Sequence, residues 1–202
     1  MSVTAATLLR ALRQKHSADA VVREVVIDDP VELAIRRRAS IENTRRWGGD
    51  EHAERRLAQY AVDGCPVAEK VPEGWDHRGS IPRRRIDALI FASTGITAVE
   101  IKVTRADFRR DTDAKRRAWR SVTNRFVYLV PKGLVTPDEV ADGCGLWEFD
   151  LERFSAQYSS THGITSTKRA KVTKDPEPLP FQVTQALAYR VSGHERKAAA
   201  DA

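Results

Sequence analysis

The stretch that decides the fold runs from Arg83 to Val103 and reads RRRIDALIFASTGITAVEIKV. Apolar residues occupy every second position on both sides of a Ser-Thr-Gly turn: Ile86, Ala88 and Ile90 precede it, and Val99, Ile101 and Val103 follow it. Period-two alternation around a glycine-containing turn predicts a β-hairpin. If Ala92 pairs with Gly95 at the turn, the same register places Asp87 opposite Glu100.

Three charged side chains share one face of this predicted hairpin. Glu100 and Lys102 are two residues apart and leave the same side of their strand. Asp87 on the facing strand would bring two carboxylates to a Cβ separation of roughly 5 Å, where like charges repel. A divalent cation between them removes that cost, because magnesium prefers hard oxygen ligands. Two alternatives stay open: a bulge at Gly95 would shift the register and separate the acids, and an ordinary half-exposed strand also alternates charged with apolar residues.

Composition narrows the class of protein. The chain has 202 residues, enough for one domain with an appended segment. Its net charge of +6 and pI of about 9.5 favour an anionic partner. We expect no membrane span and no signal peptide, because no apolar run approaches about 20 residues. With only two cysteines, Cys65 and Cys144, the sequence favours a reducing cytoplasm.

The first third of the chain predicts helices. Residues 5–12 carry a helical leucine stripe, and residues 21–27 fit either a strand or a helix. Asp29 and Pro30 begin a helix that runs towards Asn43, and a second helix begins at Asp50 after two glycines. On this second helix Glu54 lies at the edge of the apolar face, an expensive position unless a partner satisfies the carboxylate. Either a functional role or a salt bridge to residues 83–85 would do so.

The residues after the hairpin have the pattern of one helix, which we expect to begin after Thr104 as its N-cap and to end at Val122. One face carries Phe108, Thr112, Lys115, Trp119 and Val122 at helical spacing, and the other carries six arginines: Arg105, Arg109, Arg110, Arg116, Arg117 and Arg120. One guanidinium group can donate two parallel hydrogen bonds to the oxygens of a phosphate, so this face suits a nucleic-acid backbone. The alternative is a solvent-exposed face that three aspartates of the same segment partly neutralise.

Further strands follow this helix. Residues 125–130 form a buried strand that should run parallel to the second hairpin strand, because a strand–helix–strand crossover connects them. A further short strand is expected over 146–149, a polar loop over 155–167 and a last helix over 181–191. We therefore expect an α/β fold with a mixed central sheet flanked by helices. The expected division is an N-terminal helical extension over 1–47, a main domain over 48–192 and a disordered tail over 193–202.

With these residues in view, the chain resembles the PD-(D/E)XK nuclease superfamily. Asp87 followed by Glu100-Ile101-Lys102 matches the D…ExK core, and Glu54 matches the helical glutamate that often precedes it. The longer match, through VEIKVTRADF, RFVYLVPKGLV and CGLWEF, is similar to the MmcB-like DNA-repair family. Ile86 stands where the superfamily usually has proline. A Gln-x-x-x-Tyr helix, which marks the exonuclease branch, is not found.

The resemblance implies a restriction-endonuclease-like core and metal-dependent hydrolysis of DNA, in repair, recombination or phage DNA processing. It also implies the cytoplasm of a bacterial or phage-infected cell. Asp87, Glu100 and the backbone carbonyl of Ile101 would hold Mg²⁺ or Mn²⁺. Lys102 would orient the attacking water or stabilise charge on the phosphate, and Glu54 would complete the site. The DNA backbone would be held by Arg83, Arg84, Arg85, Arg105, Arg109, Arg116, Arg117 and Arg120.

Two other functions compete with the nuclease. A DNA-binding module without catalysis would retain DNA but release no product, and a protein-binding domain would use its arginines on an acidic partner. The sequence leaves open RNA as a substrate, the mode of cleavage, and the oligomeric state, a homodimer included.

Overall fold

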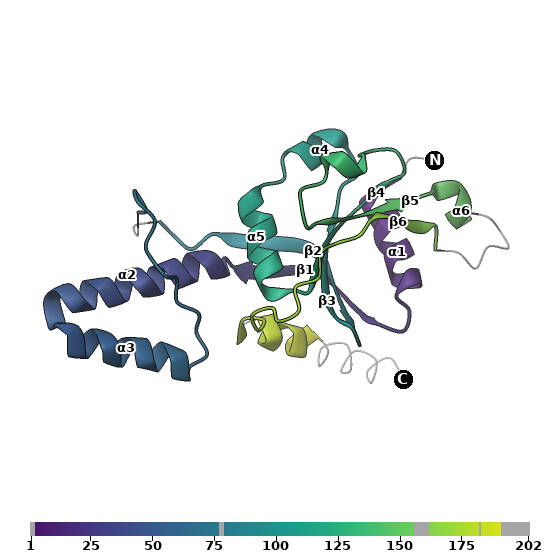
Figure 1. Ribbon diagram of the computed structural model, residues 1–202. Helices are drawn as coiled ribbons and strands as arrows, with labels where there is room; N and C mark the ends of the chain where they lie inside the picture. Colours follow the sequence, from purple (N-terminus) through teal and green to yellow (C-terminus); the bar gives the residue numbers. More distant parts are fainter. Residues whose placement is uncertain (1–2, 77–78, 156–161, 182, 191–202) are drawn as a thin grey trace. The chain divides into compact units, whose positions relative to one another are not determined.

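The structure of the chain is a computed structural model that describes residues 3–76, 79–155, 162–181 and 183–190 (Figure 1). The chain divides into two compact units, Met1–Ile27 with Arg85–Ala202, and Asp28–Arg84. This division differs from the expected boundary near residue 47, because β1 (Ala20–Asp28) joins the sheet and ties the N-terminal segment to it. The predicted tail over 193–202 lies outside the described residues.

The first unit is built on a six-stranded sheet. Its strands follow one another in chain order: β1, β2 (Arg83–Ala92), β3 (Gly95–Ile101), β4 (Arg125–Pro131), β5 (Gly145–Phe149) and β6 (Ile164–Lys168). The pairs β2–β3 and β5–β6 are antiparallel, whereas β3–β4 and β4–β5 are parallel. The expected α/β class with a mixed sheet is confirmed, as is the parallel crossover. The loop expected over 155–167 is wrong at its end, because β6 is a mostly exposed strand of serine and threonine that lacks the apolar alternation of the others.

The β2–β3 hairpin has the predicted register. Ala92 pairs with Gly95, and the ladder continues to Ala88 opposite Val99. Gly95 has a φ of +113°, and a Cβ at this position would lie 2.2 Å from Oδ1 of Asn124. The same Oδ1 accepts a hydrogen bond of 2.8 Å from the N–H of Ile96, so the glycine lets the Asn124 side chain approach and fix the start of β3.

Helices cover both faces of this sheet (Figure 1). On one face, Leu8 and Leu12 of α1 (Ala5–Lys15) pack in a cluster with Leu129. On the other face, Trp119 of α5 (Asp113–Val122) packs in a cluster with Phe126. Residues 183–190 are helical, and the remaining short helices are η1 (Pro137–Glu139) and α6 (Leu151–Ser155).

The single helix expected over 104–122 is instead two helices, α4 (Arg105–Arg109) and α5. Thr104 caps α4 as predicted, accepting a hydrogen bond of 3.1 Å from the N–H of Asp107. Thr112 is extended and caps α5 through a hydrogen bond of 3.3 Å from the N–H of Lys115. Because Thr112 supplies this second cap, the arginines are divided between two helices and do not share one face.

The second unit contains two antiparallel helices, α2 (Pro30–Gly48) and α3 (Asp50–Val62). Asp29 caps α2 as predicted, with hydrogen bonds of 3.1 and 3.3 Å from the N–H groups of Val31 and Glu32. Helix α2 continues past Asn43 to Gly48, and Gly49 makes the turn with a φ of +81°. None of the helices in the described part of the chain has the length and apolar character needed to cross a bilayer.

Candidate active site

A cavity of about 570 Å³ opens at one end of the β2–β3 hairpin. Its walls include residues of β1, β2, β3, α1 and α5, all within the sheet unit. The four residues that the sequence singles out on the hairpin, Asp87, Glu100, Ile101 and Lys102, all line it. Asp87 and Glu100 therefore face the same space, as the predicted register requires.

Asp87 lies just beyond the last backbone pair of the hairpin. Its Oδ2 accepts a hydrogen bond of 2.8 Å from the N–H of Ile101. The carboxylate thus replaces a backbone acceptor, which fixes its position at the cavity wall. This contact joins the two strands at the point where the carboxylates meet.

Glu100 is buried, with 3% of its side chain exposed. Its Oε1 accepts hydrogen bonds from Nζ of Lys115 at 2.6 Å and Nζ of Lys102 at 3.0 Å. Its Oε2 is also buried and has no hydrogen-bond partner among the described residues. Burial and the neighbouring Asp87 raise the pKa of Glu100, although both lysines act in the opposite direction. The desolvation cost of one oxygen of this carboxylate is therefore not offset by any hydrogen bond from the described residues.

Lys102 is held as a cation. Its Nζ lies 3.0 Å from Glu100 and 3.4 Å from Asp107. Burial lowers the pKa of Lys102, but Glu100 and Asp107 outweigh burial, so the net shift is upward. Lys102 can therefore donate hydrogen bonds and stabilise negative charge, but it is a poor proton acceptor at neutral pH.

Lys115 is a site residue that the sequence analysis missed. It lies in the first turn of α5 and its side chain is 22% exposed at the cavity wall. The signal was its position on the apolar stripe, four residues before the buried Trp119. A lysine on an inward face points to a buried acid.

A second buried network lies close to the site. Oδ2 of Asp111 accepts hydrogen bonds from the hydroxyl of Tyr128 and, at 3.0 Å, from Arg116. Burial and the Asp111 carboxylate raise the pKa of Tyr128, which keeps the hydroxyl protonated. This network anchors the segment between α4 and α5 to β4.

The arginines predicted to bind DNA separate into two groups. Four are engaged within the protein: Arg84 with Asp29, Arg105 with Glu139, Arg116 with Asp111, and Arg120 with the carbonyl of Asp142. The other four are exposed: Arg83, Arg85, Arg109 and Arg117. Of these eight, Arg85 alone lines the cavity.

Glu54 belongs to the second unit and does not line this cavity. Its side chain is 64% exposed and lies 3.1 Å from Arg45. The expected inward orientation is wrong, because the narrow apolar stripe of α3 buries Ala53 and leaves Glu54 in solvent. The salt bridge is made with Arg45 of α2, and not with residues 83–85.

The donor set suits one hard cation with few protein ligands. The described residues hold no group of three or more His, Cys, Asp or Glu side chains that could bind a metal. Magnesium, however, is often held by one or two carboxylates, with water and substrate oxygens completing its shell. Asp87, the free Oε2 of Glu100 and the carbonyl of Ile101 fit such a set.

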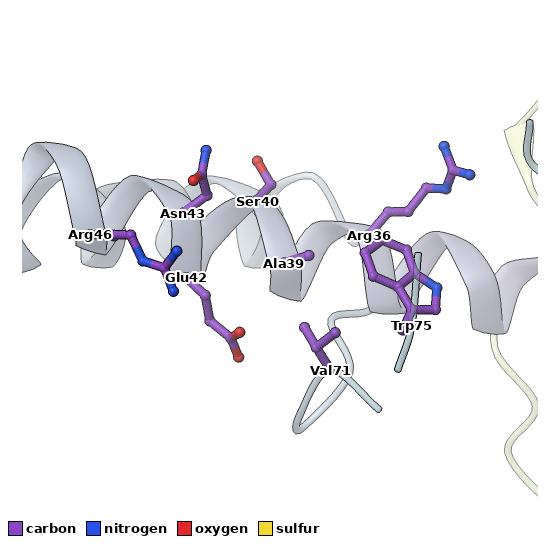
Figure 2. Close-up of a pocket in the computed structure, with 8 residues that line it drawn as sticks. All are labelled: Arg36, Ala39, Ser40, Glu42, Asn43, Arg46, Val71 and Trp75. Carbon is purple, nitrogen blue, oxygen red and sulfur yellow. The ribbon is translucent and has the colours of Figure 1, made fainter. Parts of the chain in front are cut away.

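A second cavity, of about 490 Å³, lies in the unit 28–84 (Figure 2). It is lined by residues of α2, among them Arg36, Glu42 and Arg46, together with Val71 and Trp75 of the segment between α3 and β2. The indole N–H of Trp75 donates a hydrogen bond of 3.0 Å to Glu32. No residue predicted to be catalytic lines this cavity.

Comparisons with known proteins add little. No protein-family model and no curated protein sequence matches the chain. Among solved structures, a protein of unknown function from Silicibacter pomeroyi is similar, with 22% identity and a TM-score of 0.36. The similarity covers 60% of this chain and 69% of the other. It assigns neither a family nor a function.

Proposed function

We propose that this chain is a divalent-metal-dependent nuclease that hydrolyses DNA phosphodiester bonds, with the cavity at the β2–β3 hairpin as its active site. The observation that carries the proposal is the buried Oε2 of Glu100, which has no partner among the described residues and belongs to a side chain that lines one cavity with Asp87 and Lys102. The D…ExK resemblance to the PD-(D/E)XK superfamily and its MmcB-like family supports the same assignment.

In this mechanism, Asp87, Glu100 and the carbonyl of Ile101 would hold Mg²⁺ or Mn²⁺. When bound, the cation would supply a Lewis acid and lower the pKa of a coordinated water. Lys102 stays protonated, so it orients water or stabilises charge on the phosphate and does not remove a proton. Exposed Arg85 at the cavity wall offers a donor to the DNA backbone.

The test is cleavage by the purified protein with Mg²⁺ or Mn²⁺. End-labelled linear, nicked and branched DNA substrates, with an RNA of matched sequence, would report both the substrate and the mode of cleavage. Lys102→Ala should abolish cleavage and leave most DNA affinity, because exposed arginines supply the backbone contacts. A Lys102→Ala protein with full cleavage activity would contradict the assignment.

A non-catalytic DNA-binding module is the second candidate. It is favoured by one observation: the ammonium groups of Lys102 and Lys115 both contact Glu100 and compensate its charge. This candidate predicts a gel shift of DNA and no product with either cation. A cytoplasmic location and a role in DNA repair, recombination or phage DNA processing remain parts of the proposal.

A further inference from the structure

Lys115 makes the shortest contact to the buried acid of the candidate site. Its Nζ lies 2.6 Å from Oε1 of Glu100, whereas Nζ of Lys102 lies 3.0 Å from the same atom. Its side chain is 22% exposed, compared with 7% for Lys102. The side chain of Lys115 therefore contacts the carboxylate and also lines the cavity.

The cavity wall is electrically balanced. Four carboxylates and four cationic side chains line it, so the ligand-free site has no net formal charge. A divalent cation would add two positive charges to this balanced wall. The electrostatic attraction between the cation and this wall is strongest when an anion binds together with the cation and when a lysine moves away from the carboxylate.

We infer that Lys115 is an exchangeable counter-ion of Glu100: a divalent cation displaces its ammonium group, which then binds the phosphodiester. This inference rests on the proposed nuclease function and names a third charged residue for that site. Lys115 is the lysine that exchanges because it is the more exposed of the two. Lys102 stays on Oε1 and keeps Glu100 oriented.

The inference predicts opposite effects of one substitution on metal binding and on catalysis. Lys115→Met removes a positive charge that competes with the cation, so Mn²⁺ should bind roughly tenfold more tightly without DNA. The same variant lacks the group that holds the phosphodiester, so kcat at saturating Mn²⁺ should fall by about tenfold. A residue that only supports the fold would weaken both.

The experiment is calorimetric titration of Mn²⁺ into the DNA-free full chain, with cleavage kinetics on the same preparations. Lys115→Gln is a second neutral variant, and Lys115→Arg keeps the charge and should retain wild-type Mn²⁺ affinity within about twofold. Lys132→Met is the matched control, because Lys132 is an exposed lysine of the same unit that pairs with Asp150 at 2.7 Å, outside the cavity. Its Mn²⁺ affinity and cleavage should equal those of the wild type.

Tighter Mn²⁺ binding with slower cleavage in both neutral variants supports the exchange. Unchanged or weaker Mn²⁺ binding in them overturns it, and so does failure of both to fold, which would make Lys115 a structural residue. A wild-type protein that neither binds Mn²⁺ nor cleaves DNA overturns the proposed function, and this inference with it. A wild type that binds and cleaves leaves the proposed function standing whatever the variants show.

Discussion

Asp87→Asn separates the structural role of this carboxylate from its proposed chemical role. The amide keeps an oxygen acceptor for the N–H of Ile101, which the carboxylate accepts at 2.8 Å. A hydrogen bond to a charged group contributes about 1 kcal/mol more than a neutral one. Relief of the repulsion that Asp87 exerts on Glu100 offsets part of that loss. The free energy of unfolding should therefore change by no more than about 1 kcal/mol.

Metal binding should respond far more strongly than stability. Two unit charges in contact attract by about 1 kcal/mol even in bulk water, so a divalent ion loses about 2 kcal/mol with one carboxylate. That loss corresponds to about 30-fold weaker Mn²⁺ binding. Cleavage should fall by at least about 100-fold, the usual cost of removing one charge-stabilising group from an active site.

The assay combines urea unfolding, Mn²⁺ calorimetry and DNA cleavage on one preparation. Asp138→Asn is the control, because Asp138 is an exposed aspartate of the same unit outside the cavity and should behave as the wild type. An Asp87→Asn protein with wild-type Mn²⁺ affinity and wild-type cleavage would refute the metal-binding role. Loss of the fold in this variant would show that the hydrogen bond to Ile101 matters more than estimated.

Other predictions concern the rest of the chain. Arg117→Gln should weaken DNA binding about equally for all sequences and reduce the salt slope of log K by about 1, measured by fluorescence anisotropy. Arg116→Gln should instead lower the free energy of unfolding by about 2–3 kcal/mol in urea, because it breaks a largely buried ion pair. Asn124→Ala should cost about 2–3 kcal/mol through two lost hydrogen bonds, and Asn124→Asp about half of that because it keeps one acceptor; urea unfolding checks both. Burial raises the pKa of Cys144, so little thiolate forms at neutral pH, and a disulfide reagent should label Cys65 in the native protein but Cys144 only in urea.

The sequence predicted those parts of the fold that local patterns determine. The hairpin followed from alternation and one glycine, and Asp29 with Pro30 located the start of α2. The register then placed Asp87 on the same face as Glu100, because a single turn fixes every facing pair in a hairpin. Thr112 is also a possible N-cap in the sequence. The apolar residues on both sides of it keep helical spacing, however, so the sequence did not predict the interruption between α4 and α5.

The remaining parts depend on contacts between distant segments. Lys115 reaches Glu100 across 15 residues, and this contact follows from the crossover from β3 to β4 and not from a local motif. Arg116 and Arg117 are neighbours in sequence, yet Arg116 is partly buried and paired with Asp111, whereas Arg117 is exposed. Counting arginines on a helix therefore overestimated the surface available to DNA. Glu54 was misplaced because a short apolar stripe does not reveal how narrow the buried face of a helix is.

The burial of Glu100 is itself an argument for a ligand. Burying a carboxylate costs several kcal/mol, and paired buried charges seldom stabilise a fold more than apolar residues of similar size. Among the described residues Oε2 of Glu100 has no donor, and neither has Oδ1 of Asp111. Glu100 differs from Asp111 because its side chain lines a cavity together with a second carboxylate, that of Asp87. Both lysines contact Oε1, so neither offsets the desolvation of Oε2 through a hydrogen bond. Either a cation or a water molecule bound to a cation would interact with Oε2 and offset its desolvation. The carboxylate of Asp87 at the same cavity wall favours a cation, because it adds a second negative charge.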